Sequence, residues 1–534
     1  MMKKLIIIIF TMLILSTQLT LAADWYVTQD GAGDLSGQPN VANAMPVDTF
    51  SALTGTGYAG DTFYFSGTIV WITVRISGTV GSPVILDGYY DGNCDPINAE
   101  CSGAEIDNAG TYGIWSGGAE ADYITIQDFR IKNTAHAIYF SHGSDHITIK
   151  RNYTHENQSA GIRVTCATSR CSYITVGGAL GDGNKIENAG TANGENLSMI
   201  YRTDDVVVSH NYYVITDATT YGVEGMYFYD DDRVLVEYNT VVNINKSSSP
   251  WGETGIGIKG QNNDFIVRFN KVISSMTGAT IVNGMNGGYV YGNNFSQNSI
   301  TGLSLGTQVG DAADAHLTNI YIWSNLMYEN YARGLSLQAW DCSGYSCTAS
   351  NIYIYNNTIP DNGGVSGQGI TDAGFQCLTG TNINVKNNIF YNNLNTTPAN
   401  QEIYTTNGGN IVLGNNNYYY PLGAVTLTGI SMEGDAEEAS PEFTNAAGND
   451  YTLNGTNNIN EGTDLGGVIA TVTIQGTGYV MDYKWSLNPD TTDWITIPPT
   501  VNVLDRDIVG WSRGAYAYQT SGIIPIVLRQ FFLD

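Results

Sequence analysis

The stretch WGETGIGIKGQNNDFIVRFNKV, residues 251–272, contains one complete unit of a pattern that recurs along most of the chain. Ile256 and Ile258 alternate with a glycine and a lysine, as in a half-buried strand. Turn-forming residues interrupt this alternation, a second short strand follows, and Asn270 marks a bend before a third. One such unit cannot bury its apolar face alone, so the pattern predicts copies stacked above and below it.

An asparagine at the bend marks each copy. From Asn211 onward, successive markers lie 24 to 32 residues apart, and the interval between Asn152 and Asn211 holds two units, with the middle one at 171–178. Such a period, with three short strands per unit, is typical of a parallel β-solenoid. Stacking brings like residues together, so the markers are expected to form a ladder of side-chain amides. The markers are Asn152, Asn211, Asn239, Asn270, Asn294, Asn325, Asn357, Asn388 and Asn416.

The first residues predict export. Two lysines, an apolar run and small residues up to Ala22 form the pattern of a signal peptide over residues 1–22. The run is too short to span a bilayer, so we expect a secreted protein without a membrane span, located extracellularly, at the cell surface or in the periplasm. A formal net charge of −28 disfavours nucleic acid as a partner. The oligomeric state stays open, with a monomer as the default expectation.

Seven cysteines in an exported chain predict disulfides. Six of them form three pairs that each bracket a short loop, which favours local bridges. Cys377 is left over, either as a free thiol or as an alternative partner. The predicted pairs are Cys94 with Cys101, Cys166 with Cys171, and Cys342 with Cys347.

Three opening phrases resemble the first coils of secreted right-handed parallel β-helix proteins, the pectate-lyase-like superfamily. They are DWYVTQDGAGD (24–34), GDTFYFSG (60–67) and SGTVGSPVILDG (77–88). The segments at 440–466 and 510–518 are similar to its closing segments. The resemblance implies an all-β, three-sheet right-handed parallel β-helix, and it implies the activity only weakly because many functions share such scaffolds.

The chain is expected to divide into four parts. Residues 1–22 are the signal peptide, 23–120 the N-terminal cap and first coils, 121–422 the β-helix, and 423–534 an irregular last coil followed by a C-terminal β cap. Within the last part, residues 440–518 are expected to cover the open end of the coil, because an exposed terminal coil would be a sticky edge.

In the superfamily that the chain resembles, the strand with the GIxI pattern carries the substrate groove. The outward side chains of this strand follow from the alternation, and two acidic residues stand ahead of it. Aromatic rings stack on sugars while arginine and lysine pair with carboxylates, so the set predicts a polysaccharide or cell-surface glycan as the partner. It comprises Tyr139, Arg163, Ser198, Arg202, Tyr227, Tyr229, Lys259 and Asn283, with Glu224 and Glu253 ahead of the strand.

The groove predicts a polysaccharide lyase that acts by β-elimination on a uronate. This reaction needs a base, a cation that stabilises the enolate-like charge, and an acid for the leaving oxygen. GETGIGIKG, residues 252–260, resembles the Glu-then-Lys strand phrase of alginate-lyase-type β-helix enzymes. We expect Lys259 as the base, Arg202 or Arg163 as the cation and Tyr229 as the acid. The expected substrate-binding residues are Tyr139, Tyr227, Glu224, Glu253 and Asn283.

Acidic residues recur at one turn of three neighbouring coils. Stacked carboxylates repel unless a cation joins them, and Ca²⁺ prefers oxygen ligands. A Ca²⁺ site is therefore one interpretation, and capping of the turn by Asp and Asn side chains is the structural alternative; no other cofactor is expected. The residues are Asp204, Asp205, Asp231, Asp232 and Asp264.

Two other functions stay open. Paired carboxylates could serve a glycoside hydrolase on the same fold, although the polygalacturonase set of NTD, DD, GHG and RIK does not occur in order. The pectate lyase phrases WxDH and RxPxxR are absent too. These absences and the negative charge favour a non-catalytic, adhesive surface protein that binds glycans.

Overall fold

The computed structural model describes residues 22–31, 44–88, 95–97, 104–190, 196–217, 224–244, 254–260, 262–308, 316–340, 347–363, 372–394, 400–454, 457–459, 461–488, 492–509 and 511–516. Among them, the helices are short: α2 (Val47–Ser51), α3 (Arg506–Val509), η2 (Gly408–Asn410) and η3 (Ala446–Gly448). No helix of the described part is long and apolar enough to cross a membrane.

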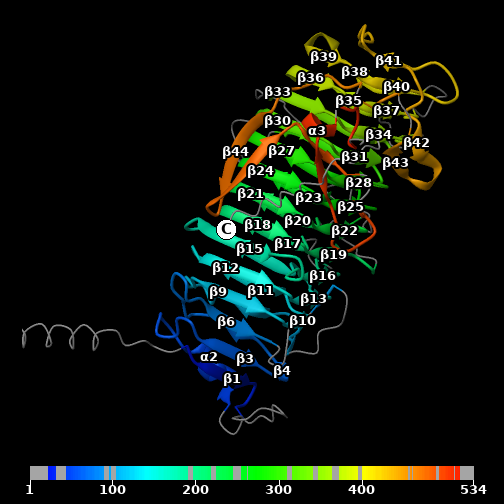
Figure 1. Ribbon diagram of the computed structural model, residues 1–534. Coiled ribbons are helices and arrows are strands. Elements are labelled where there is room, and N and C mark those ends of the chain that lie inside the picture. Colours follow the sequence, from blue (N-terminus) through cyan, green and yellow to red (C-terminus); the bar gives the residue numbers. More distant parts are fainter. Residues whose placement is uncertain are drawn as a thin grey trace, which may run out of the picture.

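The described strands wind into three long parallel sheets that take one strand each from successive coils (Figure 1). Sheet 1 contains β2 (Met45–Pro46), β1 (Asp24–Thr28), β3 (Thr62–Phe65), β6 (Val84–Asp87), β9 (Ile124–Gln127), β12 (Asp145–Lys150), β15 (Cys171–Gly177), β18 (Thr203–Ser209), β21 (Asp232–Glu237), β24 (Asn263–Arg268), β27 (Met285–Tyr291), β30 (His316–Trp323), β33 (Thr348–Tyr355), β36 (Thr381–Lys386) and β39 (Ile411–Gly414).

Sheet 2 contains the short strands that follow the bend: β4 (Thr68–Ile69), β7 (Glu105–Asp107), β10 (Arg130–Lys132), β13 (Tyr153–His155), β16 (Lys185–Glu187), β19 (Tyr212–Val214), β22 (Thr240–Val242), β25 (Lys271–Ile273), β28 (Asn294–Ser296), β31 (Leu326–Tyr328), β34 (Thr358–Pro360), β37 (Ile389–Tyr391) and β40 (Asn417–Tyr419).

Sheet 3 contains the GIxI strands: β5 (Ile72–Thr73), β8 (Tyr112–Trp115), β11 (His136–Ser141), β14 (Ile162–Thr165), β17 (Ser198–Tyr201), β20 (Met226–Tyr229), β23 (Thr254–Lys259), β26 (Thr277–Val282), β29 (Thr301–Gln308), β32 (Arg333–Trp340), β35 (Ala373–Cys377), β38 (Ile403–Thr405) and β41 (Leu427–Thr428). The expected all-β, three-sheet parallel coil is confirmed.

Apolar residues at alternate strand positions face inward and meet their equivalents in the next coil. Ile147, Ile174 and Val206 are in register in sheet 1, and all are fully buried. Such columns form one continuous core along the coil. The parallel pairing places like residues about 4.8 Å apart, so each coil covers the apolar edge of its neighbours.

The asparagine ladder is present and runs through ten coils. In each step, the backbone N–H and the side-chain Nδ2 of one asparagine donate to Oδ1 of the next, for example from Asn211 to Asn239 at 3.0 Å each. Asn184 supplies the member in the coil for which the sequence pattern gave no marker. Asn293, not Asn294, is the member in its coil, because Asn294 already belongs to β28.

A second ladder follows sheet 2 through Asn298, Asn330, Asn362 and Asn393. Both ladders end in a glutamate. Asn416 donates to Glu433 Oε1 at 3.0 Å from its backbone N and 2.8 Å from Nδ2, and Asn393 Nδ2 donates to Glu402 Oε2 at 2.5 Å. The glutamate oxygens accept what the next asparagine would have accepted, so the last asparagine of each ladder keeps an acceptor for its N–H groups.

The C-terminal residues do more than cover the open end. Val425, Leu427, Ile430, Met432 and Ala436 pack on the last coil of the core. Residues 440–518 were expected at that end as well, but the structure places much of the described part of this segment along the side of the coil (Figure 1). Its strands are β42 (Phe443–Asn445), β43 (Asp450–Leu453), β44 (Val468–Ile474), β45 (Thr477–Asp482), β46 (Trp485–Leu487) and β47 (Val503–Asp505).

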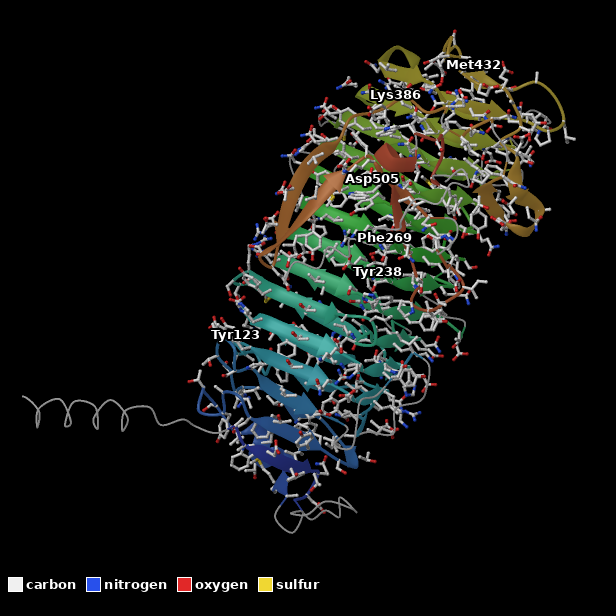
Figure 2. All side chains as sticks on the ribbon, viewed as in Figure 1. Tyr123, Tyr238, Phe269, Lys386, Met432 and Asp505 are labelled. Atoms are coloured by element: carbon white, nitrogen blue, oxygen red, sulfur yellow. A yellow bond between two sulfur atoms is a disulfide. The ribbon has the colours of Figure 1, made fainter. Side chains whose placement is uncertain are left out.

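The returning segment covers the outward face of sheet 1. The hairpin β44–β45 lies beside β18 and β21, and Gln475 at its tip bonds Asp205 and the carbonyl of Ile174. The tilted rings of Tyr238 and Phe269, with centres 5.2 Å apart, belong to the apolar cluster that sheet 1 forms with this segment (Figure 2). The segment follows sheet 1 because the outward positions there are apolar.

Candidate functional site

The outward face of sheet 3 brings several predicted groove residues into register. Tyr139, Arg163 and Tyr227 belong to one column, which Met199 joins between the last two. Tyr229 and Lys259 are direct neighbours in the adjacent column. The expected outward position of Ser198 is wrong: Ser198 is in register with the inward Met226 and is buried, so Met199 and Tyr201 face outward in that coil.

Glu224 and Lys259 form the centre of this face. Lys259 Nζ forms an ion pair with Glu224 Oε1 and lies 5.4 Å from the centre of the Tyr227 ring. Gly257 leaves room for this approach, since a Cβ there would lie at the near limit of van der Waals contact, 3.4 Å from both Glu224 Oε2 and Lys259 Cε. The lysine can therefore fold back across its own strand to reach the carboxylate. We call Glu224, Tyr227, Tyr229 and Lys259 the central cluster.

Burial sets the electrostatics of the central cluster. Glu224 is only 5% exposed, and loss of solvation raises the pKa of its carboxyl while Lys259 opposes the rise. Burial and the nearby Glu224 charge also raise the pKa of Tyr227. Tyr229 stacks between Tyr227 at 6.0 Å and Tyr201 at 5.5 Å. The cluster thus combines one ion pair with a row of phenol rings.

Arg163 lies at a distance from the central cluster. It is three coils away from Lys259 in the sheet order, which corresponds to about 14 Å at the spacing of parallel strands. Its Nε donates to Thr165 Oγ1 at 3.0 Å, and its guanidinium lies 5.6 Å from the centre of the Tyr139 ring. Arg163 and Lys259 therefore cannot act on the same sugar ring.

Sequence reasoning missed the neighbours of Tyr139 and Arg163. Tyr112, Trp115 and His136 gather around Tyr139, and Tyr201 joins the tyrosine row. The signal was present in YGIW (112–115), which has the same alternation as the later groove strands. The predicted set of groove residues begins one coil later, at Tyr139.

Arg202 and Asn283 lie in the turn that follows sheet 3, both with positive φ. Arg202 Nη1 donates to the carbonyl of Ala167 at 2.7 Å, and its Nε lies 3.5 Å from Asp230 Oδ2. The backbone N–H of Asn283 donates to Gly306 O at 3.4 Å. Neither residue belongs to the outward columns of sheet 3.

The predicted acidic turn is present, and arginines occupy it. Arg170 contacts Asp204 at 2.6 Å and Asp230 at 3.5 Å, while Arg233 forms a forked pair with Asp205. These ion pairs offset part of the negative charge of the stacked carboxylates.

Asp231 and Asp264 complete the turn. Asp231 accepts the backbone N–H groups of Thr203 and Tyr229 at 2.7 and 2.8 Å, and its burial raises the carboxyl pKa well above the usual value. Burial also raises the pKa of Asp264. In the described part of the chain, no three His, Cys, Asp or Glu side chains are grouped to hold a metal ion, and the Ca²⁺ site stays a prediction.

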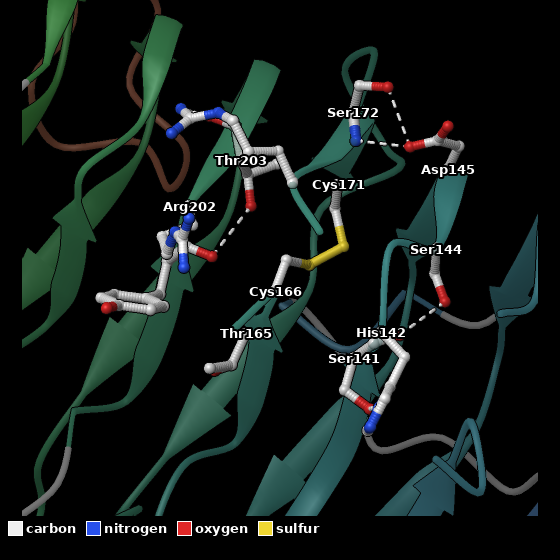
Figure 3. Close-up of a disulfide and its surroundings, with 12 residues drawn as sticks. Ser141, His142, Ser144, Asp145, Thr165, Cys166, Cys171, Ser172, Arg202 and Thr203 are labelled. Atoms are coloured by element: carbon white, nitrogen blue, oxygen red, sulfur yellow. Dashed lines mark hydrogen bonds between the residues drawn. A yellow bond between two sulfur atoms is a disulfide. The ribbon is translucent and has the colours of Figure 1, made fainter. Parts of the chain in front are cut away.

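The cysteines agree with the predicted pattern where they are described. Cys166 and Cys171 form a disulfide across the turn between β14 and β15 (Figure 3), and this turn carries Arg170. Cys347 is disulfide-bonded, and Cys377 is a buried free thiol whose pKa burial raises to about 11. Glu253, Cys94, Cys101 and Cys342 lie outside the described residues.

Sequence comparison supports the fold. Residues 89–295 match the family model described as a right-handed β-helix region. The chain has a right-handed parallel β-helix fold. A search of curated proteins finds no significant match.

Several solved structures are remotely similar to this β-helix. A lacto-N-biosidase from Eubacterium ramulus is 10% identical, with 73% of this chain and 68% of that chain covered and a TM-score of 0.40. An Azotobacter vinelandii mannuronan C-5 epimerase A-module is 12% identical, with 74% and 93% covered and a TM-score of 0.38. An alginate lyase from Paenibacillus is 13% identical, with 61% and 93% covered and a TM-score of 0.36. These similarities are too remote to bring an activity to this chain.

Proposed function

We propose that this protein is exported, binds a uronate-containing polysaccharide along the outward face of sheet 3, and cleaves it by β-elimination at the central cluster. The observation that carries the proposal is the meeting of Lys259, Glu224, Tyr227 and Tyr229 on one open face of the coil. A cation and phenols at one position are the groups that this elimination requires.

The reaction removes the proton from C5 of the uronate and breaks the bond between C4 and the glycosidic oxygen. The electrons of the C5–H bond form the C4–C5 double bond, and the leaving oxygen takes a proton. A cation beside the uronate carboxylate stabilises the charge that develops on it. No oxidant or water is consumed, so side chains alone can perform the step.

The ion pair suggests a division of roles that differs from the one expected from the sequence. Lys259 suits the cation beside the uronate carboxylate, because its amine already donates to the Glu224 carboxylate and is not directed at C5 as a base. Tyr229, in register with Lys259, then suits the transfer of the proton from C5 to the leaving oxygen. Glu224 holds the Lys259 amine in place.

Elimination suits this face better than hydrolysis. A glycoside hydrolase uses two carboxyl groups roughly 5 to 10 Å apart, whereas the open part of sheet 3 from β8 to β23 brings one described carboxylate, Glu224, to the cluster. The nearby Asp231 carboxylate is bonded to backbone amides in the turn.

The test is to incubate the protein with alginate, pectate, glycosaminoglycans and neutral glycans, with and without Ca²⁺, and to follow ultraviolet absorbance from unsaturated uronate. We expect product with an acidic polysaccharide, and loss of at least about 100-fold in kcat/KM for Lys259→Met. Lys259→Arg separates the two roles: it retains part of the activity if Lys259 is the cation and none if Lys259 is the base. Lys150→Met is the matched control. Lys150 lies on sheet 1, away from the central cluster, and its amine is likewise paired with a carboxylate, that of Asp182.

Glycan binding without cleavage is the second candidate. It is favoured by the same ion pair, because an amine already bonded to a carboxylate is not a free base. Retention of the protein by a polysaccharide in affinity electrophoresis, together with no unsaturated product from any member of the panel, would establish binding alone.

A further inference from the structure

Four aromatic side chains form a compact group on sheet 3, far from the central cluster. The Tyr112 ring lies 4.9 Å from Trp115, 5.3 Å from Tyr139 and 5.7 Å from His136. Tyr112, Trp115 and Tyr139 are partly exposed, and His136 is buried beneath them. We call this group, with Arg163 at its edge, the distal platform.

Arg163 brings a positive charge to the distal platform. The backbone N–H of Ala160 donates to His136 Nδ1 at 3.2 Å. Burial, helped by the positive charge of Arg163, lowers the pKa of His136 to about 4. Arg163 Nη1 lies 3.4 Å from His136 Nε2. At neutral pH the platform therefore presents one guanidinium beside a neutral aromatic surface.

The platform and the central cluster occupy the two ends of one open stretch. From β8 to β20, the outward column passes through Trp115, Tyr139, Arg163, Met199 and Tyr227, all partly exposed. Trp115 lies five strands from Gly257 in the sheet order, or about 24 Å at the spacing of parallel strands. This length accommodates several sugar residues of an extended chain.

Beyond β23 the same column is closed. Thr280, Ser304 and Ser336 continue it in register, yet they are 6%, 4% and 0% exposed. The described outward face of sheet 3 is thus accessible on the β8 side of Lys259 and inaccessible on the other side. A glycan chain at the central cluster meets a long accessible surface in one direction only.

From this geometry we infer that the distal platform is a glycan-binding subsite for acidic sugars that holds the substrate on one side of the central cluster. The inference rests on the proposed function for the position of cleavage, but not for binding. Aromatic rings offer apolar surface to sugar rings, and the Arg163 guanidinium pairs with a uronate carboxylate. Recognition by the platform requires a chain long enough to reach from Lys259 to Trp115.

The test measures affinity against chain length by isothermal titration calorimetry. Uronate oligosaccharides of increasing length are titrated into Lys259→Met protein, which prevents turnover, and into the same protein carrying Trp115→Ala, Tyr139→Ala or Arg163→Gln. Tyr173→Ala is the matched control, since Tyr173 is an exposed ring of sheet 1 stacked on His146. Near-ultraviolet circular dichroism checks that each variant is folded.

We expect Trp115→Ala and Tyr139→Ala to weaken binding of the longest oligosaccharide by roughly tenfold and to leave the shortest bound as before. Arg163→Gln should weaken binding of the long acidic chains, and Tyr173→Ala should change nothing. Equal affinity of Trp115→Ala and its parent for every length overturns the platform, and so does an absence of binding to any uronate chain.

The two proposals fail in different ways. Length-dependent binding that Trp115→Ala abolishes, in a wild-type protein that forms no unsaturated product, supports the platform and overturns β-elimination. Unsaturated product formed equally well from short and long chains by wild type and Trp115→Ala supports β-elimination and overturns the platform.

Discussion

The outward faces of sheet 1 and sheet 3 belong to the same coils but have opposite fates. On sheet 1 from β18 to β33, one outward column contains Val207, Leu235, Ile266, Tyr289, Tyr321 and Tyr353, and the C-terminal segment packs over it. On sheet 3 from β8 to β20, the outward column stays partly exposed. The inward core is similar in both sheets, so the outward side chains alone decide whether a face is covered by the chain itself or left for a ligand.

Sheet 1 makes the same point within a single column. Before β18 this column holds Thr125, Thr148 and Thr175, and after β33 it holds Asn384. The apolar stretch coincides with the apolar contact to the C-terminal segment, whereas contacts beyond it are polar, such as Thr175 Oγ1 with Gln475 Oε1 at 3.2 Å and Asn387 Nδ2 with Thr463 O at 2.7 Å. Strands that are buried on both faces lose the alternation of apolar and polar residues. The sequence shows this change between HITIK in the uncovered β12 and NIYIW in the covered β30.

The strongest test of the comparison removes a ring from the covered face. Trp323 is fully buried, stacks on Tyr291 at 4.2 Å and meets Tyr483 of the C-terminal segment at 5.9 Å. Trp323→Ala should lower the free energy of unfolding by about 3 to 5 kcal/mol, because it leaves a cavity between coil and segment. Urea denaturation followed by tryptophan fluorescence measures the change.

Lys150 is the matched control, since it occupies the equivalent column position in an uncovered coil. Lys150→Ala should stay within about 0.5 kcal/mol of wild type. An equal loss of stability in both variants would show that covering the face contributes nothing of its own.

The stabilities of variants on the two faces can be compared directly only at a pH where no buried group titrates. Glu402 determines this pH range. Burial raises its pKa to about 8 from 4.5. The folded state therefore holds a proton that the unfolded state releases, so stability is full below about pH 4.5 and falls as the pH rises toward 8. Between about pH 5 and pH 8 the loss should reach up to about 4 kcal/mol.

Glu402→Gln should remove this pH dependence, because the amide has no proton to lose. Asn393 donates to both Glu402 oxygens and the amide keeps only one of them, so the variant should also lose stability by an amount that does not depend on pH. Denaturant unfolding at the two pH values gives the result. A pH-dependent loss that is the same in Glu402→Gln and wild type would assign the titration to another group.

On the open face, Gly257→Ala sharpens the role of the central cluster. The added Cβ would contact Glu224 Oε2 and Lys259 Cε at 3.4 Å, so the ion pair shifts while the fold is retained. If the cluster cleaves uronates, kcat/KM should fall by about tenfold at an unchanged melting temperature. Unchanged kcat/KM would show that the close approach across Gly257 is unimportant.

The smallest expected effect is at the tip of the covering hairpin. Gln475→Ala removes the side-chain bonds to the Ile174 and Asp205 carbonyls, which should lower stability by about 1 kcal/mol. Gln475 has positive φ, so Gln475→Gly, which also relieves the backbone, should lose less. A larger loss in the glycine variant would contradict this account.

The fold followed from the sequence because its signals repeat. Inward residues such as Ile256 and Ile258 recur along the whole β-helix and the bend asparagines recur in ten coils, so an error in one coil is corrected by the others. The prediction named Asn294 where the structure has Asn293, because two asparagines are adjacent at that bend. Such an error shifts one rung and leaves the ladder intact.

The site was less accessible to prediction because it depends on single residues. The alternation placed Tyr227, Tyr229 and Lys259 outward, but it failed at Ser198, where a polar residue faces inward. Glu224 and Lys259 belong to neighbouring coils. The turns between the strands of these coils vary in length, so the alternation alone does not predict that the two side chains meet. The outward aromatic rings of NIYIW and NIYIY indicate that this face of sheet 1 is covered. They do not indicate which part of the chain covers it, so the path of the C-terminal segment was not predicted.

The glutamates at the ends of the asparagine ladders carry one more consequence. Every asparagine both donates and accepts, so any rung could be followed by another, and nothing in the repeat itself limits the number of turns. Glu433 and Glu402 accept but offer no N–H onward. The two glutamates thus terminate the asparagine ladders, which the repeat alone could extend to any number of coils, and they fix the length of each ladder.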